Sequence, residues 1–194
     1  MDFSVAIVGR PNVGKSALFN RIAGTSSSIV HRESGVTRDR LYSCCEWQGQ
    51  EFTLIDTGGL DLSSSGEMVK AIISQVEQAI EEADILVFVV DARAGITPED
   101  LEVSQILRKT RKPILVAANK CDALGQEQRA VEFYSLGFPT VFPVSASHGL
   151  GIGDLLDAII EQAQRLEGAA RKDTEEVYDQ ATEAIRVAIA GKPN

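Results

Sequence analysis

Eight residues near the amino terminus have the types and the spacing of a loop that binds phosphate groups. Residues 9–16 read Gly-Arg-Pro-Asn-Val-Gly-Lys-Ser, which fits the pattern Gly-x-x-x-x-Gly-Lys-Ser. Glycines allow successive backbone amides to turn toward phosphate oxygens, and the beginning of a helix adds partial positive charge. In such a loop Lys15 bridges the outer phosphates, and the hydroxyl of Ser16 binds a magnesium ion. The sequence therefore predicts a site for a nucleoside phosphate.

Two carboxylates follow apolar runs that predict buried strands. Asp56 comes directly after the run 52–55, and Asp122 lies shortly after the run 114–118. Ligands of open α/β sheets bind at the carboxyl ends of the strands, so we expect Asp56 to hold the magnesium ion through a water. Asp122 can accept hydrogen bonds from N1 and the exocyclic amine of guanine, whereas adenine has no amine there.

A third segment at a strand end, residues 145–147, can offer its backbone amides to the oxygen of the base. Taken singly, Asp56 or Asp122 fits a helix cap or a solvated loop equally well. An ATP-using kinase or motor domain fits the phosphate loop but leaves residues 119–122 without a role. The segments together, in this order and at strand ends, favour a guanine nucleotide.

Hydrophobic periodicity predicts the elements that position these segments. Apolar runs typical of strands buried on both faces occur at residues 5–8, 52–55, 85–90, 114–118 and 141–144. Helical patterns lie between them: an apolar stripe over 69–80, a helix that begins at Thr97 with Pro98 and Asp100 in its first turn, and a helix around 155–163. A hairpin joins 41–47 to 52–55. The pattern predicts an α/β fold: a mostly parallel six-stranded sheet with one antiparallel strand and helices on both faces.

Composition and charge exclude several classes of protein. Of the 194 residues, 44% are hydrophobic and 24% charged, which is typical of a folded globular chain. With 28 Asp and Glu against 19 Lys and Arg, the net charge of −9 disfavours non-specific binding to nucleic acid. Since no apolar run has the length of a membrane span, we expect no membrane partner. The three cysteines lack metal-ligand spacing and fit a reducing cytoplasm.

The last residues repeat the first predicted strand and the beginning of the phosphate loop. Residues 187–194 read Val-Ala-Ile-Ala-Gly-Lys-Pro-Asn, and residues 5–12 read Val-Ala-Ile-Val-Gly-Arg-Pro-Asn. We expect a nucleotide-binding domain over 1–166, a linker over 167–185 and the truncated beginning of a second such domain over 186–194. The alternative is an ordinary tail that happens to resemble the first strand.

Residues 3–166 resemble the guanine-nucleotide-binding domains of translation-factor-type GTPases. The phosphate loop, Gly-Val-Thr-Arg-Asp at 35–39, Asp-Thr-Gly-Gly-Leu at 56–60 and Asn-Lys-Cys-Asp at 119–122, followed by a second phosphate loop, resemble the bacterial Der (EngA) family. That family has two tandem GTPase domains and a KH-like domain, and it assists assembly of the large ribosomal subunit. The resemblance implies a P-loop NTPase G domain that hydrolyses GTP to GDP, with the large ribosomal subunit, a second G domain and a KH-like domain as partners.

The resemblance also implies roles for individual residues. Thr37 belongs to the first switch and closes on Mg²⁺ and the outer phosphate. Residues 58 to about 66, which include Gly59, match the second switch. Asn12 matches an asparagine that binds K⁺ in potassium-activated GTPases; the alternative is a side chain that hydrogen-bonds the neighbouring backbone. We expect Lys15, Thr37, Gly59 and Asn12 to act in catalysis, and Ser16, Thr37 and Asp56 to bind Mg²⁺. The expected nucleotide contacts are Gly9, Arg10, Pro11, Asn12, Val13, Gly14, Lys15, Ser16, Ala17, Asp56, Gly59, Asn119, Lys120, Asp122, Ser145, Ala146 and Ser147.

One departure from Ras-like domains keeps a second function open. Where those domains carry a glutamine that orients the attacking water, this chain carries Leu60, so we expect slow intrinsic hydrolysis of GTP. A potassium ion beside the phosphates would supply charge that an arginine finger supplies elsewhere. The alternative function is a nucleotide-sensing switch module with negligible turnover of its own.

Overall fold

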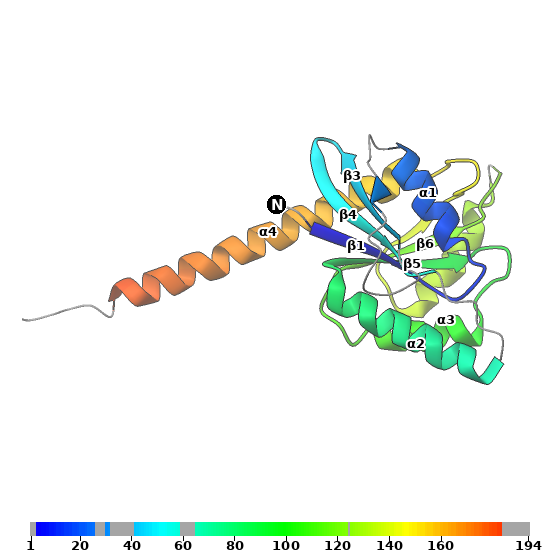
Figure 1. The fold of residues 1–194 in the computed structure, drawn as a ribbon, viewed down its shortest axis with the longest axis horizontal. Helices are drawn as coiled ribbons and strands as arrows, with labels where there is room; N and C mark the ends of the chain where they lie inside the picture. The colour runs from blue at the N-terminus through cyan, green and yellow to red at the C-terminus, as the bar shows by residue number, and fades with distance from the viewer. Residues whose placement is uncertain (1–2, 26–29, 32–40, 59–64, 124, 184–194) are drawn as a thin grey trace, which may run out of the picture.

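The computed structural model describes residues 3–25, 30–31, 41–58, 65–123 and 125–183. One sheet contains the strands β1 (Phe3–Val8), β2 (Val30–His31), β3 (Leu41–Trp47), β4 (Gln50–Asp56), β5 (Ile85–Asp91), β6 (Ile114–Asn119) and β7 (Val141–Pro143). Their order is β2-β3-β4-β1-β5-β6-β7, with helices on both sides of the sheet (Figure 1). The predicted α/β fold is confirmed.

The sheet has the six predicted strands and one addition at its edge. The additional strand, β2, has two residues and pairs antiparallel with β3. A strand of two residues is too short to show the alternation of apolar and polar residues that predicts a strand from sequence. β3 and β4 form the predicted hairpin through Gln48 and Gly49, whose φ angles of 51° and 76° suit a two-residue turn. β3 therefore runs opposite to its neighbours, and the remaining strand pairs are parallel.

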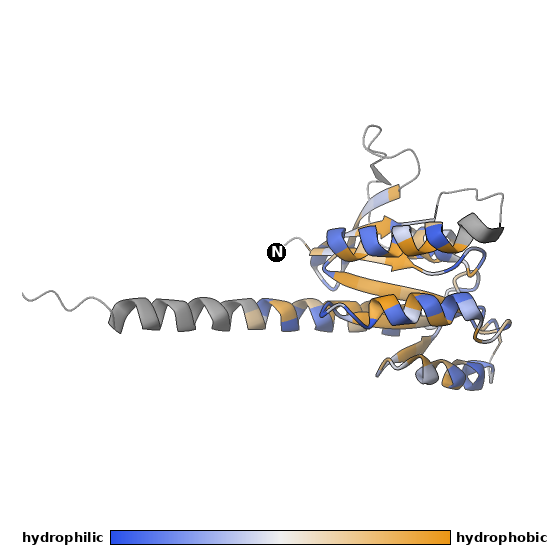
Figure 2. Cartoon of the chain, turned by 90° about the horizontal axis from the view of Figure 1, so that it is seen from below, coloured by the Kyte–Doolittle hydropathy of each residue, from blue (hydrophilic) through white to orange (hydrophobic). Residues whose placement is uncertain are grey.

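Five helices accompany the sheet in the described part of the chain. They are α1 (Lys15–Thr25), α2 (Ser65–Glu82), α3 (Pro98–Leu107), the 3-10 helix η1 (Glu127–Leu136) and α4 (Ile152–Glu183). The hydrophobic strands lie between helices whose hydrophilic residues face outward (Figure 2). α3 begins as predicted: Thr97 Oγ1 accepts a hydrogen bond from the Asp100 amide, and Asp100 Oδ2 accepts one from the Thr97 amide (3.1 Å).

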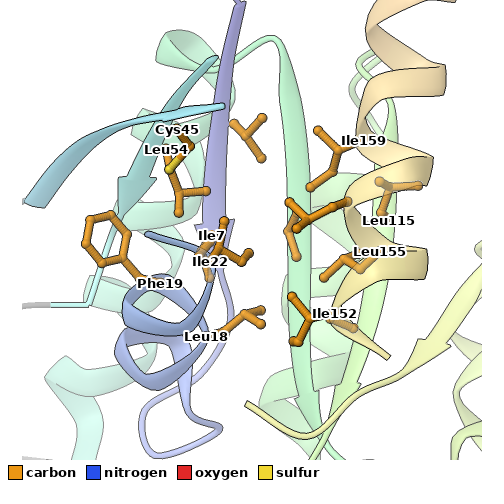
Figure 3. Packing of buried hydrophobic residues seen from close by; sticks show 14 of the residues in the cluster. Ile7, Leu18, Phe19, Ile22, Cys45, Leu54, Leu115, Ile152, Leu155 and Ile159 are labelled. Carbon is orange, nitrogen blue, oxygen red and sulfur yellow. The ribbon is translucent and has the colours of Figure 1, made fainter. Parts of the chain in front are cut away.

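The core consists of two layers, one on each face of the sheet. Successive side chains of a strand point to opposite faces, so Val5 and Ile7 of β1 pack with residues of α1 and α4. Ala6 and Val8 instead pack with residues of α2, α3 and η1. Figure 3 shows the first layer. In it, buried side chains of α1 and α4 pack on the same face of β1 and β5. Burial on both faces explains why these strands appear as unbroken apolar runs.

The 3-10 helix η1 was not predicted from the sequence. Its buried residues, Ala130, Phe133 and Leu136, are spaced by three, which matches the three residues per turn of this helix type. The chain leaves the helix at Gly137, whose φ of 86° suits a residue without a side chain. A spacing of three followed by glycine is therefore the signal that predicts this element.

Helix α4 extends across the predicted boundary at residue 166. It continues to Glu183, and its carboxyl-terminal part projects away from the sheet (Figure 1). The predicted linker is therefore helical over 167–183, while the repeat at 187–194 lies outside the described residues. Among the helices that the structure describes, none has the length and apolarity needed to cross a bilayer.

Candidate nucleotide-binding site

The parallel strands bring the predicted segments to one edge of the sheet. β1 pairs with β4 on one side and with β5 on the other, so the strand order reverses direction at β1. The crevice outside the carboxyl ends at such a point is the usual ligand site of open α/β sheets. Asp56 ends β4 opposite Ile7, and Asn119 ends β6 opposite Asp91. The predicted phosphate loop, magnesium ligand and base-binding segments all begin at this edge.

Two glycines allow the phosphate loop to pass close to neighbouring chain segments. Gly9 has φ 148°, and a Cβ atom there would clash with the carbonyl oxygen of Val89 on β5. Gly14 has φ 98°, and a Cβ atom there would clash with the amide nitrogen of the Asn119 side chain. Both positions require glycine on conformational and steric grounds. The loop is therefore packed directly against β5 and β6.

Lys15 is held under the phosphate loop. Its side chain is 8% exposed, and Nζ donates to the carbonyl oxygens of Gly9 (2.8 Å) and Arg10 (2.9 Å). Burial lowers the pKa of Lys15, and the nearby carboxylate of Asp56 opposes this effect. The ammonium of Lys15 therefore lies against the loop that is predicted to bind phosphate.

Asp56, Lys15 and Ser16 converge beside Gly58. A Cβ atom at Gly58 would lie 3.0 Å from Asp56 Oδ1, 3.2 Å from Lys15 Cε and 3.4 Å from Ser16 Oγ. Asp56 is 1% exposed; Oδ1 accepts a hydrogen bond from the Gly58 amide (2.9 Å), whereas Oδ2 is buried without a hydrogen-bond partner. A buried carboxylate oxygen in need of a partner, beside a hydroxyl, fits a magnesium ion. Gly58 was placed in the second switch by the sequence resemblance, but it was not among the predicted nucleotide contacts.

The side chain of Arg10 points away from the loop and toward α3. Its Nε lies 3.3 Å from Oδ2 of Asp100, which is 0% exposed. The same carboxylate oxygen accepts hydrogen bonds from the amide (3.1 Å) and the hydroxyl (3.0 Å) of Thr97. The cap of α3 therefore also anchors the phosphate loop, and any contact of Arg10 with a nucleotide comes from its backbone.

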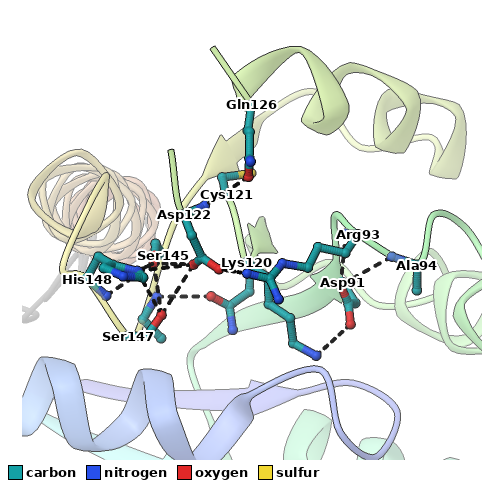
Figure 4. A network of polar contacts seen from close by, with 12 residues as sticks. Asp91, Arg93, Ala94, Lys120, Cys121, Asp122, Gln126, Ser145, Ser147 and His148 are labelled. Carbon is teal, nitrogen blue, oxygen red and sulfur yellow. Dashed lines mark hydrogen bonds and ion pairs between the residues drawn. The ribbon is translucent and has the colours of Figure 1, made fainter. Parts of the chain in front are cut away.

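At the base end, Asp122 is surrounded by polar side chains (Figure 4). Its Oδ1 accepts hydrogen bonds from the hydroxyls of Ser145 (2.6 Å) and Ser147 (3.2 Å), and His148 Nδ1 lies 3.4 Å away. Its Oδ2 contacts the guanidinium of Arg93. The hydrogen bond from Ser145 is the main reason that the pKa of Asp122 is lowered. Arg93 and His148 come from other loops, and no local pattern predicts their approach to Asp122.

Asn119 connects the phosphate loop to the base-binding loop. Its Nδ2 donates to the carbonyl oxygen of Val13 (2.9 Å), and its Oδ1 accepts from the amide of Ala146 (3.0 Å). The amide of Ser145 donates to the carbonyl oxygen of Leu150 (2.9 Å). Two of the three amides predicted to face the base, those of Ser145 and Ala146, therefore donate to protein groups.

Lys120 makes a second connection between the two ends. Its Nζ donates to the carbonyl oxygen of Asn12 (2.8 Å) and to Oδ2 of Asp91 (2.6 Å). Burial raises the pKa of Asp91, but the Lys120 bond and the amides of Arg93 and Ala94 outweigh it and hold the pKa below its usual range. Asn12 has φ 65°, a conformation that asparagine tolerates better than most residues.

A pocket of about 360 Å³ opens between α1 and the base-binding loop. It is lined by Ala17, Asn20, Arg21, Gly24, Thr25 and Ala146. Ala17 and Ala146 were both predicted to contact the nucleotide, one at the phosphates and one at the base. The pocket therefore borders both ends of the site.

Residues 4–120 match the family model MMR_HSR1, described as 50S ribosome-binding GTPase. The chain belongs to this family. It is 49% identical over 191 residues to GTPase Der of Symbiobacterium thermophilum, covering 98% of this chain and 39% of that protein. It is 48% identical over 190 residues to GTPase Der of Staphylococcus epidermidis, covering 98% and 41%. The predicted resemblance is confirmed, and the chain spans about two fifths of the length of these relatives.

Solved structures of related GTPases share the fold. Era of Aquifex aeolicus, bound to GDP and AlF₄⁻, has a TM-score of 0.66 at 29% identity, over 83% of this chain and 56% of that one. The G domain of the T. maritima FeoB iron transporter has a TM-score of 0.61 at 28% identity, over 84% and 99%. The predicted P-loop G-domain fold is therefore confirmed.

For this member of the 50S ribosome-binding GTPase family, the described residues include most of the predicted site. They bring together residues 9–17, Asp56, Asn119 to Asp122 and residues 145–147. Pro11 is half-buried, and the hydroxyl-bearing Ser16 is exposed at the beginning of α1. Thr37 and Gly59, together with Leu60, lie outside the described residues.

Proposed function

We propose that this domain binds GTP at the carboxyl edge of its sheet and hydrolyses it to GDP and phosphate. The observation that carries the proposal is the pair of connections made by Asn119 and Lys120, which join the phosphate loop to the segment that contains Asp122. A site built this way binds phosphates and a base together. The carboxylate of Asp122 matches the donors of guanine and has no such match in adenine.

Hydrolysis in this proposal depends on positioning and charge rather than on a covalent intermediate. The ammonium of Lys15 stabilises negative charge that develops on the outer phosphates during attack by water. Ser16 and Asp56 would hold Mg²⁺, with Thr37 as a further ligand. The bound ion would neutralise part of the phosphate charge. The buried Oδ2 of Asp56 supports this assignment, as does an Era structure in complex with MgGDPNP.

Asn12 is proposed to bind a potassium ion beside the phosphates. The bond from Lys120 to its backbone carbonyl fixes the backbone of Asn12 within the loop, which supports a defined position beside the phosphates. The positive φ of Asn12 equally suits the alternative, in which asparagine serves the loop conformation alone. The test below distinguishes the two by exchanging potassium for sodium.

The proposed context is assembly of the large ribosomal subunit, with a second G domain and a KH-like domain. The family description, 50S ribosome-binding GTPase, supports the large subunit as the partner, and an Era structure in complex with 16S ribosomal RNA supports ribosome association in general. The chain spans about two fifths of the Der relatives, which leaves room for further domains. The thiols of Cys44 and Cys121 are not joined in a disulfide, in keeping with the expected reducing cytoplasm.

Single-turnover hydrolysis of GTP and ATP, with magnesium and in potassium or sodium chloride at equal ionic strength, tests the proposal. We expect loss of GTP alone, faster in potassium. Equal hydrolysis of ATP would contradict the guanine assignment. Tight binding of GTP without turnover in either salt would favour the switch module, which Leu60 keeps open.

A further inference from the structure

The guanidinium of Arg21 joins α1 to the loop expected to contact the base. Arg21 Nε donates to the carbonyl oxygen of Ala146 (2.7 Å), and Nη2 donates to that of Ser147 (2.6 Å). The side chain also lies against Gly149, where a Cβ atom would be 3.7 Å from Arg21 Nη1. Because α1 begins at Lys15, the same helix carries the phosphate-binding lysine and, about two turns later, this contact with the loop.

These bonds fix the direction of two consecutive peptide groups. In a trans peptide the carbonyl and the N–H point opposite ways, and the described residues contain no cis peptide. Holding the Ala146 carbonyl toward α1 therefore turns the Ser147 amide away from it. The Ser145 carbonyl accepts from the Gly149 amide (2.7 Å), and the Ala146 amide points at Asn119 Oδ1. The amides of Ser145 and Ala146 thus donate to Leu150 and Asn119, and Arg21 sets the direction of the Ser147 amide.

We propose that Arg21 is a positioning residue for guanine recognition. By holding the carbonyls of Ala146 and Ser147, it keeps the Ser147 amide directed at the 6-oxo group of the purine. Amide donors match an oxygen at C6 and oppose the 6-amino group of adenine, which is itself a donor. This inference rests on the proposed function, since it concerns the same nucleotide.

Arginine is suited to this role, and the pocket supports it. The guanidinium is a rigid fork that donates to two carbonyls at once, whereas a lysine ammonium is a single point charge on a flexible stem. Arg21 lines the pocket between α1 and the loop together with Ala17 and Ala146. The contact is therefore made beside the predicted nucleotide and not on a distant surface.

The test compares the dissociation constants of GDP, IDP and ADP for the wild-type chain and for Arg21→Met, by competition with a fluorescent GDP analogue. IDP keeps the 6-oxo group but lacks the 2-amino group that faces Asp122, and ADP has a 6-amino group. We expect the affinities for GDP and IDP to fall by the same factor, about tenfold. The affinity for ADP changes by less than about twofold, because it uses no loop amide. Arg21→Lys keeps one donor and recovers part of the loss.

Arg165→Met is the matched control. Arg165 is an exposed arginine on α4 that pairs with Glu161 (2.6 Å), and its removal leaves all three constants unchanged. Equal losses for GDP, IDP and ADP in Arg21→Met would indicate general loosening and overturn the inference, as would an unchanged affinity for GDP. If the wild-type chain itself does not bind GDP, the proposed function fails instead.

Discussion

Charged side chains are buried at the phosphate end of the site and largely exposed at its base end. Lys15, Asp56 and Asp100 are 8%, 1% and 0% exposed. At the base end, the side chain of Asp122 is 15% exposed, whereas those of Arg93 and His148, which contact it, are each 57% exposed. An unpaired buried charge is costly, whereas solvent screens an exposed one. Substitutions at the phosphate end should therefore affect folding or the affinity for every nucleotide, and those at the base end should mainly change guanine preference.

Lys15→Met gives the largest expected effect. The affinities for GTP, GDP and ATP fall by on the order of 100-fold, because a buried charge partner of the phosphates is lost. The factor is the same for guanine and adenine nucleotides, since the ammonium faces no base. Titration with fluorescent nucleotide analogues measures it. Lys109→Met, which removes an exposed lysine, is the matched control with wild-type affinities. A loss confined to guanine nucleotides would contradict the comparison.

Arg10→Met tests whether the buried anchor of the phosphate loop supports the fold. It leaves the carboxylate of Asp100 buried without its charge partner, so the free energy of unfolding falls by about 3 kcal/mol in urea denaturation. Adding Asp100→Asn recovers most of this loss, because the buried charge is then absent. Thr97→Ala removes the cap but keeps the ion pair and costs about 1 kcal/mol. Additive losses in the double variant would show that the pair is not coupled.

Ser145→Ala tests the base end with a smaller effect. The Ser145 hydroxyl donates to Asp122 at 2.6 Å, so its loss lowers the affinity for GDP by about tenfold through poorer orientation of the carboxylate. Ser147→Ala is the matched variant, with a longer bond of 3.2 Å and an expected loss below about threefold. Isothermal titration calorimetry ranks the two. An equal or reversed order would refute this role for Ser145.

Asp91→Asn gives the smallest expected effect, seen in the pH dependence of stability. Burial disfavours the charge of Asp91, yet the Lys120 bond and two amides hold its pKa below the unfolded value of about 3.9. The charged form therefore stabilises the fold above that pH, and this contribution disappears as the pH falls through the folded-state pKa. Unfolding free energies measured between about pH 5 and pH 3 should decline less steeply in Asp91→Asn. Identical slopes would contradict a stabilising role for this carboxylate.

The sequence predicted the features that depend on local pattern. Alternation and apolar runs located the six longer strands, and the cap of α3 followed from Thr97, Pro98 and Asp100. Asp56 and Asp122 were placed correctly at strand ends because parallel strands end at one edge. The continuation of α4 past residue 166 was not predicted, although the Ala, Glu, Gln, Lys and Arg of this stretch are strong helix formers, because Gly168 and the mixed charge were interpreted as linker composition.

Contacts between distant parts of the chain were beyond local pattern. Arg21 and Ala146 are separated by 125 residues, and Arg93 and Asp122 by 29. Arg21 lies on α1, where hydrophobic periodicity predicts only which face of the helix is buried. Arg93 lies in a loop, where an arginine is ordinarily solvated. Their roles depend on the order of the strands, which brings the loops after β5, β6 and β7 together.

Dissociation constants of GDP and XDP for the wild-type chain and for Asp122→Asn test the central claim most directly. Xanthine carries an oxygen where guanine carries the 2-amino group, so an amide at position 122 matches xanthine and a carboxylate matches guanine. The wild-type chain should prefer GDP and Asp122→Asn should prefer XDP, each by at least about tenfold, with unchanged urea unfolding. An undiminished preference for GDP in Asp122→Asn would contradict base recognition at this end of the site.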